Sequence, residues 1–240
     1  MESAGDLRRA GNEEFRRGQY GAAAELYSRA LAVLEDAGEA AAEERSVLLA
    51  NRAACQLRDG ACRGCVADCC GALSLTPFAI KPLLRRAAAY EALESFALAY
   101  VDYKTALQVD CSIQAAHDGT AAGIERARTL KEEGNELVKK GNHKKAIEKY
   151  SESLKLKQEC ATYTNRALCY LTLKQHKEAV QDCTEALRLD PKNVKAFYRR
   201  AQALKELKDY KSSIADINSL LKIEPKNTAA LRLLQELNRA

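Results

Sequence analysis

Two groups of five polar residues occupy matching places in the two halves of the chain. Each group contains three cationic side chains and two primary amides, which can hold carboxylates through charge-assisted hydrogen bonds without any covalent step. The first clamp, as we call it, consists of Arg8, Asn12, Asn51, Lys81 and Arg85, and the second clamp consists of Lys131, Asn135, Asn165, Lys195 and Arg199. This chemistry predicts a binding protein rather than an enzyme.

The spacing within each clamp indicates that helices position its residues. In the second clamp Lys131 and Asn135 are four residues apart, as are Lys195 and Arg199, so each pair would share one face of a helix. Asn165 would lie on a helix between them. We therefore expect a groove with amides on its floor and cations on both walls. A peptide that ends in Asp or Glu fits such a groove, because its terminal and side-chain carboxylates would lie only ~4–6 Å apart.

Internal repetition predicts these helices. Three segments of the first half return in the second: the one at Leu7 returns at Leu130, the one at Leu49 at Tyr163, and the one at Ile80 at Val194. In each half the middle amide and the last arginine of the clamp are 34 residues apart. A 34-residue period of paired helices is typical of the tetratricopeptide (TPR) repeat. On this pattern all ten clamp residues lie on the first helices of repeats, which line the concave face of a TPR array.

The predicted fold is all-α, with two superhelical TPR modules of three repeats each in tandem. The first module spans residues 1–118, with repeats at about 4–37, 46–79 and 80–113. The second spans residues 125–240, with repeats at about 127–159, 160–193 and 194–226 and a capping helix at 227–240. Residues 119–124 form a short junction between the modules.

Two stretches depart from the regular repeat. Eight extra residues around DAGEAAAEERS separate the first two repeats, and we interpret them as an extended second helix followed by a loop. A cap for the first module could begin at residues 112–118, but His117-Asp118-Gly119-Thr120 is expected to interrupt it. Either that cap is very short or the first helix of the second module takes over its role.

The composition fits a soluble helical protein. Apolar residues make up 47% of the chain and charged residues 30%, which is ordinary for a globular protein, and only 12 Gly and 4 Pro are present. The amino-terminal sequence MESAGDLRRAGNEEF has no apolar run, so it predicts neither a secretory signal nor an integral membrane segment. Nine cysteines without such a signal favour a reducing compartment. We therefore expect a cytoplasmic location.

Charge is unevenly distributed along the chain. Residues 1–123 carry 13 Lys and Arg against 17 Asp and Glu, a net charge of −4, whereas residues 124–240 carry 25 against 16, a net charge of +9. A basic second half could attract nucleic acid, an acidic membrane surface or an acidic peptide. Charge alone leaves these three open.

The cysteine-rich segment CRGCVADCC invites a zinc or redox interpretation. However, Cys62, Cys65 and Cys69 fall on one helical stripe, at places where other repeats carry Tyr or Phe, Ala and Tyr. We interpret them as small apolar packing residues. His143 and His176 replace the usual aromatic residue at one packing position in two repeats, and we expect them to be structural. No nucleophile has a recognisable partner and no Gly-rich phosphate loop occurs, so we expect no active site, no metal and no cofactor.

The clamps and repeats resemble the TPR co-chaperones with dicarboxylate clamps. The segments LKEEGNELVKKGNHKKAIEKYSESL, NRALCYL and KNVKAFYRRAQA are similar to co-chaperones of mitochondrial protein import. KPLLRRAAAYEAL and AYVDYKTALQVD also fit relatives that act in motile-cilium assembly. The chain departs from these relatives in two ways: Arg8 replaces a lysine, and the long segment that they carry between the modules is nearly absent.

This resemblance implies partners and a location. Co-chaperones of this family bind the Glu-Glu-Val-Asp tails of the seventy- and ninety-kilodalton heat-shock chaperones, and client preproteins are further partners. The resemblance implies that the first module favours the seventy-kilodalton chaperone and the second the ninety-kilodalton one. It also implies a cytoplasmic protein with a peripheral place at the mitochondrial outer membrane.

Three functions can be compared on the residues. A co-chaperone adaptor with two grooves could bring two chaperones, or a chaperone and its client, together. An RNA-binding helical-repeat protein would repeat its polar residues in every unit, whereas here the clamp residues follow a 2-1-2 pattern, so we expect no nucleic-acid partner. A scaffold or receptor for other acidic C-terminal peptides, as in ciliary dynein-arm assembly, would share the clamps. Only the identity of the partner separates it from the first function.

Overall fold

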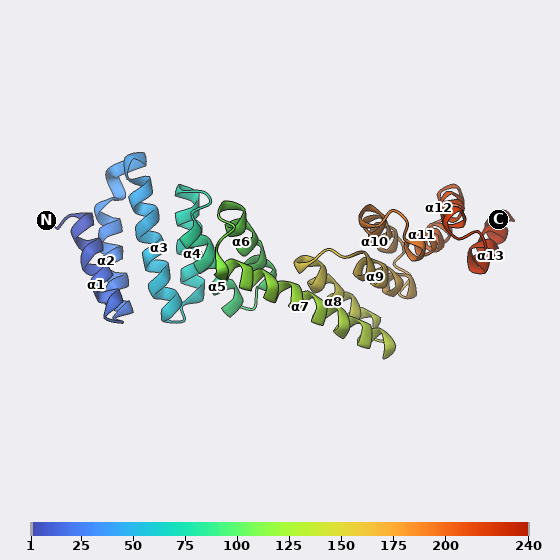
Figure 1. Cartoon of the computed structure of the whole chain (residues 1–240), viewed down its shortest axis with the longest axis horizontal. Helices are drawn as coiled ribbons and strands as arrows, with labels where there is room; N and C mark the ends of the chain where they lie inside the picture. Colours follow the sequence, from blue (N-terminus) through green and yellow to red (C-terminus); the bar gives the residue numbers. More distant parts are fainter. Residues whose placement is uncertain (1, 240) are drawn as a thin grey trace. The chain divides into compact units, whose positions relative to one another are not determined.

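The structure of the chain, a computed structural model, describes residues 2–239 with the exception of the side chain of Asp36. Helices form all of the regular structure between residues 2 and 239, and the predicted all-α fold is confirmed (Figure 1). The α-helices are α1 (Ala4–Arg16), α2 (Tyr20–Val33), α3 (Ala42–Arg58), α4 (Cys62–Leu75), α5 (Ile80–Ala92), α6 (Phe96–Val109), α7 (Gln114–Lys139), α8 (His143–Leu156), α9 (Cys160–Thr172), α10 (His176–Leu189), α11 (Val194–Glu206), α12 (Tyr210–Ile223) and α13 (Thr228–Leu237).

Successive helices pack against one another as the TPR period predicts. The packed pairs include α1 with α2, α3 with α4, α5 with α6, α9 with α10 and α11 with α12. The second helix of every pair has 14 residues. The first helices, α1, α3 and α5 in one half and α7, α9 and α11 in the other, carry the clamp residues.

Small buried side chains let the paired helices approach closely. The second helices share a position that is at most 2% exposed and is filled by Ala23, Cys65, Ala99, Ala146, Ala179 and Ser213. Four residues later each has another buried side chain: Tyr27, Cys69, Tyr103, Tyr150, Cys183 and Ile217. Cys65 and Cys69 therefore stand where other repeats have Ala and Tyr, which confirms that these two thiols are packing residues.

A buried ion pair ties together the two helices of four repeats. In each, an arginine of the first helix donates two hydrogen bonds of 2.6–2.8 Å to an aspartate of the second helix. The pairs are Arg52–Asp68, Arg86–Asp102, Arg166–Asp182 and Arg200–Asp216. A third nitrogen of each arginine contacts a hydroxyl or thiol on the second helix of the preceding repeat: Ser28, Cys70, Ser151 and Thr184, respectively. Each arginine therefore joins three helices.

The chain divides into two compact units, Met1–Gly123 and Ile124–Ala240. Helix α7 begins in the first unit and continues into the second, so the interruption expected at residues 117–120 does not occur. The start of α7 covers the core of the first unit: Ala116 is fully buried, and Gly119 lies against the ring of Tyr103. Of the two alternatives for the cap, the structure shows the shared helix.

The insertion between the first two repeats differs from the prediction. Helix α2 ends at Val33, as long as every other second helix, so the interpretation as an extended second helix was wrong. The extra residues form a 3-10 helix, Glu35–Ala41, in which Gly38 has φ 60°, a value that a continuing α-helix cannot take. The remainder lengthens α3, which has 17 residues against 13 in α9.

Candidate functional site

The floor of each clamp is built by a glycine, a tyrosine and an asparagine. A Cβ atom at Gly11 would lie 2.8 Å from Cε1 of Tyr27, so glycine is what lets this ring of α2 lie against α1. The Tyr27 hydroxyl then donates to Oδ1 of Asn12 at 2.7 Å. The second unit repeats the arrangement with Gly134, Tyr150 and Asn135, where the Cβ distance would be 2.6 Å and the hydrogen bond is 2.7 Å long.

Both of these tyrosines are protonated at neutral pH. Desolvation raises the pKa of Tyr27 and of Tyr150 to about 12, so each hydroxyl acts as a donor. Donation to Oδ1 fixes the orientation of the amides of Asn12 and Asn135. Neither Nδ2 atom has a hydrogen-bond partner in the part of the chain that the structure describes, and neither is sealed from solvent. Both amide NH2 groups can therefore donate to a ligand.

The middle asparagine of each clamp joins this floor from the next first helix. Nδ2 of Asn165 donates to Oδ1 of Asn135 at 3.1 Å, and Nδ2 of Asn51 lies 3.5 Å from Oδ1 of Asn12. In each unit one amide oxygen thus accepts hydrogen bonds from both a tyrosine hydroxyl and a second amide. The structure thus brings the two amides together in both units, and their contact is shorter in the second.

The buried ion pairs hold this middle asparagine in place. Arg52 follows Asn51 directly and Arg166 follows Asn165, and each arginine is bound to an aspartate with a side chain that is no more than 9% exposed. Because three helices meet at each arginine, the adjacent turn of helix has little freedom to shift. The backbone that carries the asparagine is therefore held in place by the adjacent ion pair.

The last arginine of each clamp lies half-buried on the third first helix. Nη1 of Arg85 donates to the carbonyl of Ala50 at 2.6 Å, and Nη1 of Arg199 donates to the carbonyl of Thr164 at 2.5 Å. Each carbonyl belongs to the residue just before the middle asparagine. Burial lowers the pKa of both guanidinium groups, which still stay charged because arginine is not deprotonated in proteins.

Lys81 and Lys195 are the exposed cations of the clamps. Each stands one helical turn before the clamp arginine, on the same face of α5 or α11. Within residues 2–239 neither lysine side chain has an ion-pair or hydrogen-bond partner. Both ammonium groups are therefore available for a carboxylate from outside.

The first cation is the member that differs between the clamps. In the second unit Nζ of Lys131 lies 3.1 and 3.2 Å from the two carboxylate oxygens of Glu159, the residue that precedes α9. In the first unit Nη1 of Arg8 lies 4.0 Å from Oε1 of Glu44, a much looser contact. The second clamp thus has an internal carboxylate on one of its three cations.

Among the cavities at the first clamp, two share Asn51. One, of about 170 Å³, is lined by Asn12, Asn51 and Arg85 together with Tyr27. The other, of about 470 Å³, is lined by Asn51 and Lys81 and by apolar side chains that include Phe78, which is 65% exposed. The structure therefore brings four of the five predicted residues of this clamp to adjoining cavities, with Arg8 on the flank toward Glu44.

The tyrosines and the ion pairs contact the clamp residues or their neighbours, although the spacing of the clamp residues alone does not indicate them. A signal for them exists in the sequence. A tyrosine follows the first clamp asparagine by fifteen residues in both modules, as Tyr27 follows Asn12. An arginine precedes an aspartate by sixteen residues in four repeats, as Arg52 precedes Asp68.

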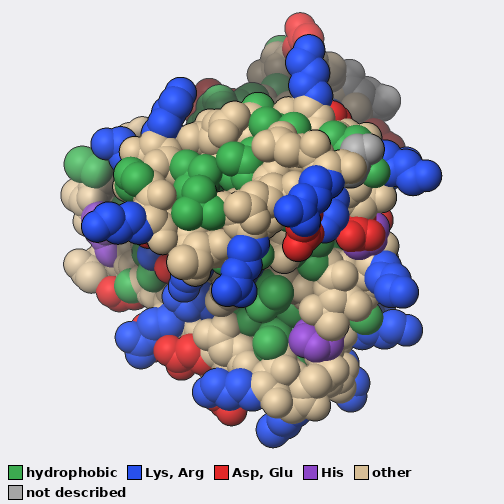
Figure 2. All heavy atoms as spheres, turned by 90° about the vertical axis from the view of Figure 1, so that its right-hand side faces the viewer, with side chains coloured by type: hydrophobic (Ala, Val, Ile, Leu, Met, Phe, Trp, Pro, Cys, Tyr) green, Lys and Arg blue, Asp and Glu red, His purple; other side chains and the backbone are tan. Residues whose placement is uncertain are grey.

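Other candidate chemistry finds no support in the described residues. Within residues 2–239 no cluster of three His, Cys, Asp or Glu side chains could hold a metal ion. His143 and His176 lie half-buried, and their buried Nδ1 atoms have no partner in that part of the chain, which fits a packing role. No helix of the described chain is both long and apolar enough to cross a membrane. On the face of the second unit in Figure 2, Lys and Arg side chains outnumber Asp and Glu.

Comparison with known proteins gives three kinds of match. Residues 161–193 and 194–227 each match a tetratricopeptide repeat family. Mitochondrial import receptor subunit TOM34 of Homo sapiens is 52% identical over 256 residues, covering 81% of this chain and 83% of the relative. Sperm-associated antigen 1 of Homo sapiens is 45% identical over 260 residues, covering 85% of this chain and 28% of the relative. Among solved structures, the Arabidopsis OM64 TPR domain is 38% identical with a TM-score of 0.48, covering 49% of this chain and 98% of that chain.

Proposed function

The chain belongs to the family of tandem TPR proteins that includes mitochondrial import receptor subunit TOM34, a family of binding proteins rather than enzymes, and on that premise we propose that it is a co-chaperone adaptor with two carboxylate-binding clamps. One clamp lies in each module. The ligand class is a peptide with an acidic carboxyl terminus, and the reaction is binding alone.

One observation supports this proposal: in both units the oxygen of an asparagine amide accepts a hydrogen bond from a tyrosine, whereas the NH2 group has no partner within residues 2–239. A carboxylate accepts hydrogen bonds and donates none, so it matches the free NH2 groups of Asn12 and Asn135. The unpaired Lys81 and Lys195 supply positive charge on the adjoining helix. A neutral ligand could accept hydrogen bonds from the NH2 groups but would gain no ion pair with the lysines, and a basic ligand would be repelled by them.

The proposed ligands are the Glu-Glu-Val-Asp tails of the seventy- and ninety-kilodalton heat-shock chaperones. Such a tail presents its terminal carboxylate and a neighbouring side-chain carboxylate together, which suits amides and cations on adjacent helices. The name of the TOM34 relatives supports a place in mitochondrial protein import, with client preproteins as cargo and a peripheral position at the outer membrane. Two clamps on one chain would raise the effective concentration of a second chaperone beside the first.

A second candidate function is a scaffold for the acidic C-termini of other proteins. It is favoured by the 45% identity to sperm-associated antigen 1, a relative that this chain covers only in part. The two functions share the clamps and differ in the partner. Competition between chaperone-tail peptides and other acidic C-terminal peptides separates them.

Calorimetric titration of the full chain with a chaperone-tail peptide tests the proposal. Asn51→Ala together with Lys81→Ala disables the first clamp, so the second can be measured alone. We expect micromolar binding that falls at least about tenfold in Lys195→Ala or Asn135→Ala, since each removes a hydrogen bond to a charged group. Amidation of the peptide carboxylate should weaken binding similarly. An unchanged affinity in Lys195→Ala, with helix content intact by circular dichroism, would contradict the clamp.

A further inference from the structure

The larger of the two cavities that share Asn51 carries apolar surface that the first clamp does not use. It has a volume of about 470 Å³ and lies at the amino-terminal parts of α3 and α5. Val47, Phe78 and Val109 line it and remain 40%, 65% and 48% exposed, respectively. Large apolar side chains gathered in an open hollow are typical of a binding surface.

The backbone of Phe78 adopts an unfavourable conformation. Its φ is 65°, in the left-handed region that bulky residues rarely adopt. Within residues 2–239 no other non-glycine residue in a connection between repeats has a positive φ, and Lys192, at the corresponding place in the second unit, does not share it. Residues held in such conformations cluster at ligand-binding sites. The exposed ring and the strained backbone together favour a role of Phe78 in binding.

The opposite side of Asn51 offers a path for the rest of a bound peptide. There the cavity of about 170 Å³ is followed by one of about 410 Å³, and the two share Phe15, Ala54 and Arg85. Together they lead toward the carboxyl ends of α1 and α3. A peptide whose terminal carboxylate meets the amides of Asn12 and Asn51 would run along this path. Only the side chain of its last residue would then face the apolar cavity.

We propose that the apolar cavity receives the side chain of the last residue of the ligand, so that the first clamp also binds acidic tails that end in a large apolar residue. The inference depends on the proposed function, because it needs the terminal carboxylate in the clamp. Continuity with the clamp supports it, since Asn51 and Lys81 line the cavity. Glu43 also lines it and disfavours a second carboxylate deep inside. Leucine or phenylalanine fits this combination of size and chemistry.

The second unit lacks the apolar surface at the corresponding positions. The middle asparagines of the two clamps are 114 residues apart, and the same offset places Ala161 at the position of Val47 and Lys192 at that of Phe78. A cation thus replaces the exposed aromatic ring beside the clamp lysine. A terminal carboxylate side chain should therefore be preferred by the second clamp, and an apolar one should gain nothing there.

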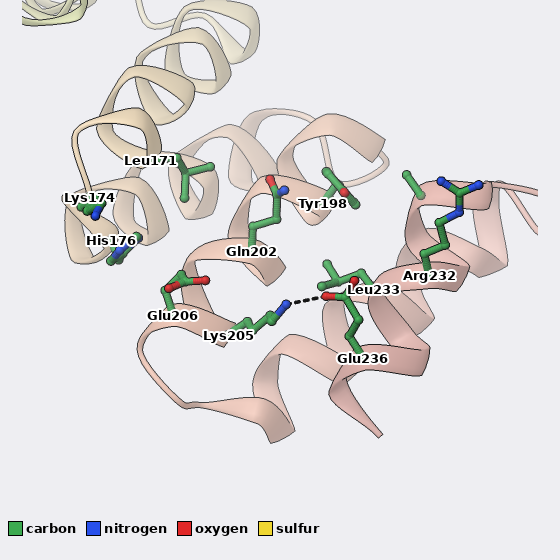
Figure 3. A pocket seen from close by; sticks show the side chains of 11 residues that line it. Leu171, Lys174, His176, Tyr198, Gln202, Lys205, Glu206, Arg232, Leu233 and Glu236 are labelled. Carbon is green, nitrogen blue, oxygen red and sulfur yellow. Dashed lines mark hydrogen bonds and ion pairs between the residues drawn. The ribbon is translucent and has the colours of Figure 1, made fainter. Parts of the chain in front are cut away.

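A large cavity of the second unit is not the counterpart of this apolar cavity. It has a volume of about 680 Å³ and is lined by Gln202 and Glu206 near the end of α11, with Arg232 of α13 among the other residues (Figure 3). The apolar cavity of the first unit instead contacts Ile80 and Lys81 at the start of α5. The two cavities thus lie at opposite ends of the third clamp helix of their units.

Three peptides that differ only in their last residue test the inference, namely Glu-Glu-Val followed by Asp, Asn or Leu. Each is titrated calorimetrically into the full chain with the second clamp disabled by Asn165→Ala and Lys195→Ala. Replacing Asp by Asn removes one carboxylate and should weaken binding at least about tenfold, the effect of a hydrogen bond to a charged group. The Leu peptide should bind about tenfold more tightly than the Asn peptide, because its side chain becomes buried in the cavity.

Two changes of the protein should remove the advantage of Leu over Asn. In a chain with the first clamp disabled by Asn51→Ala and Lys81→Ala, the second clamp should bind the Leu and Asn peptides alike. With the first clamp intact and the second disabled, Val47→Ala combined with Phe78→Ala should bring the ratio of the two affinities to near one. The affinity for the Asp peptide should stay within about twofold, because neither side chain belongs to the clamp.

A matched variant separates the cavity from exposed apolar surface in general. Leu98→Ala combined with Val101→Ala removes two side chains of α6 that are 50% and 55% exposed and lie outside the cavity, so it should leave the ratio unchanged. The inference would be overturned, and the clamp left intact, by equal binding of Leu and Asn peptides to the first clamp, by a preference for Leu in both clamps, or by a preference that survives Val47→Ala with Phe78→Ala. Failure of the Asp peptide to bind the first clamp would overturn the proposed function of that clamp, and the inference with it.

Discussion

The two clamps share a floor and differ at the rim, a term we use for the first cation and for the residues beside the exposed lysine. In both units a tyrosine hydroxyl holds the first asparagine at 2.7 Å, and a half-buried arginine donates to the carbonyl before the middle asparagine. At the rim, the first cation contacts a carboxylate at 3.1 Å in the second unit, against 4.0 Å in the first. Phe78 near Lys81 in the first unit corresponds to Lys192 near Lys195 in the second.

This difference shows which residues are tied to folding and which are free to vary. The glycine, tyrosine and ion pairs of the floor are part of the packed core, so changing them disturbs the repeat itself. The rim residues are partly or fully exposed and can change with little loss of packing. We therefore expect floor variants to act alike in both units, and rim variants to act in one unit only.

The largest effect should come from breaking a buried ion pair under the floor. Asp182→Ala leaves the Arg166 guanidinium half-buried without its partner, and we expect a loss of about 3–5 kcal/mol in the free energy of unfolding. Asp68→Ala should cost the first unit a similar amount, because Arg52 makes the same contacts there. Chemical denaturation followed by circular dichroism measures both losses.

A surface ion pair on the same helix provides the control for Asp182→Ala. Glu185 pairs with Arg188 on α10 at 2.9 Å, with side chains 38% and 58% exposed. Glu185→Ala should therefore change the free energy of unfolding by no more than about 1 kcal/mol. A loss in Asp182→Ala as small as that of Glu185→Ala, or a large loss in only one unit, would contradict a floor shared by the two clamps.

The sequence predicted the repeats and the clamp helices but not these supports. Period, spacing and duplication indicate which helix a residue lies on, so the all-α fold followed from residues such as Asn51 and Arg85. They do not show which polar groups satisfy one another. The contact of Tyr150 with Asn135 depends on how closely two helices approach, and that distance is set by packing at Gly134.

The insertion and the cap are two further features that the sequence pattern did not predict correctly. Local breakers such as Gly119 predicted an end to the helix, yet α7 continues because Gly119 lies against the ring of Tyr103. Tertiary packing thus outweighed local helix propensity. The ion pair between Lys131 and Glu159 was also not predictable from the repeat pattern, since the corresponding acid of the first unit, Glu44, stands at a different place in its repeat.

A smaller effect should follow from a single methyl group in the floor. Gly11→Ala places a Cβ atom 2.8 Å from Cε1 of Tyr27, so the ring must shift, and its hydroxyl moves away from Asn12. Overpacking costs about 1–3 kcal/mol, partly offset by the better helix propensity of alanine. We expect a net loss of stability, measured by thermal denaturation, and weaker tail binding by calorimetry. Gly134→Ala should do the same to the second clamp.

A second glycine of the first unit separates packing from helix propensity. A Cβ atom at Gly21 on α2 would meet nothing within 4 Å, so Gly21→Ala should be neutral or stabilising by up to about 1 kcal/mol. The Gly21→Ala protein should bind the chaperone-tail peptide with the same affinity as the parent chain. If Gly11→Ala behaves like Gly21→Ala in both measurements, the close approach of Tyr27 does not position the amide.

The smallest effect tests the rim, where Glu159 already contacts Lys131. A tail carboxylate that pairs with Lys131 must compete with this internal carboxylate, so Glu159→Gln should strengthen tail binding to the second clamp. The gain should be at most about fivefold, since ion pairs that water still reaches contribute about 0.2–1 kcal/mol, and Lys131 and Glu159 are both partly exposed. Glu44→Gln should change the first clamp less, because Arg8 lies 4.0 Å from that carboxylate. Calorimetry at low ionic strength, with the other clamp disabled, measures both.

The sign of the Glu159→Gln effect distinguishes competition from positioning. Glu159 also accepts a hydrogen bond from Thr162 at 3.2 Å, so it could hold Lys131 in place rather than compete for it. If Glu159 positions Lys131, Glu159→Gln should weaken tail binding. If Glu159 competes for Lys131, Glu159→Gln should strengthen tail binding. Glu185→Gln removes the same charge at a distance from the clamp and corrects for the general field, which salt screens. A gain no larger than that of Glu185→Gln would mean that the difference in the first cation does not distinguish the two clamps, and discrimination would then depend on residues such as Phe78 and Lys192.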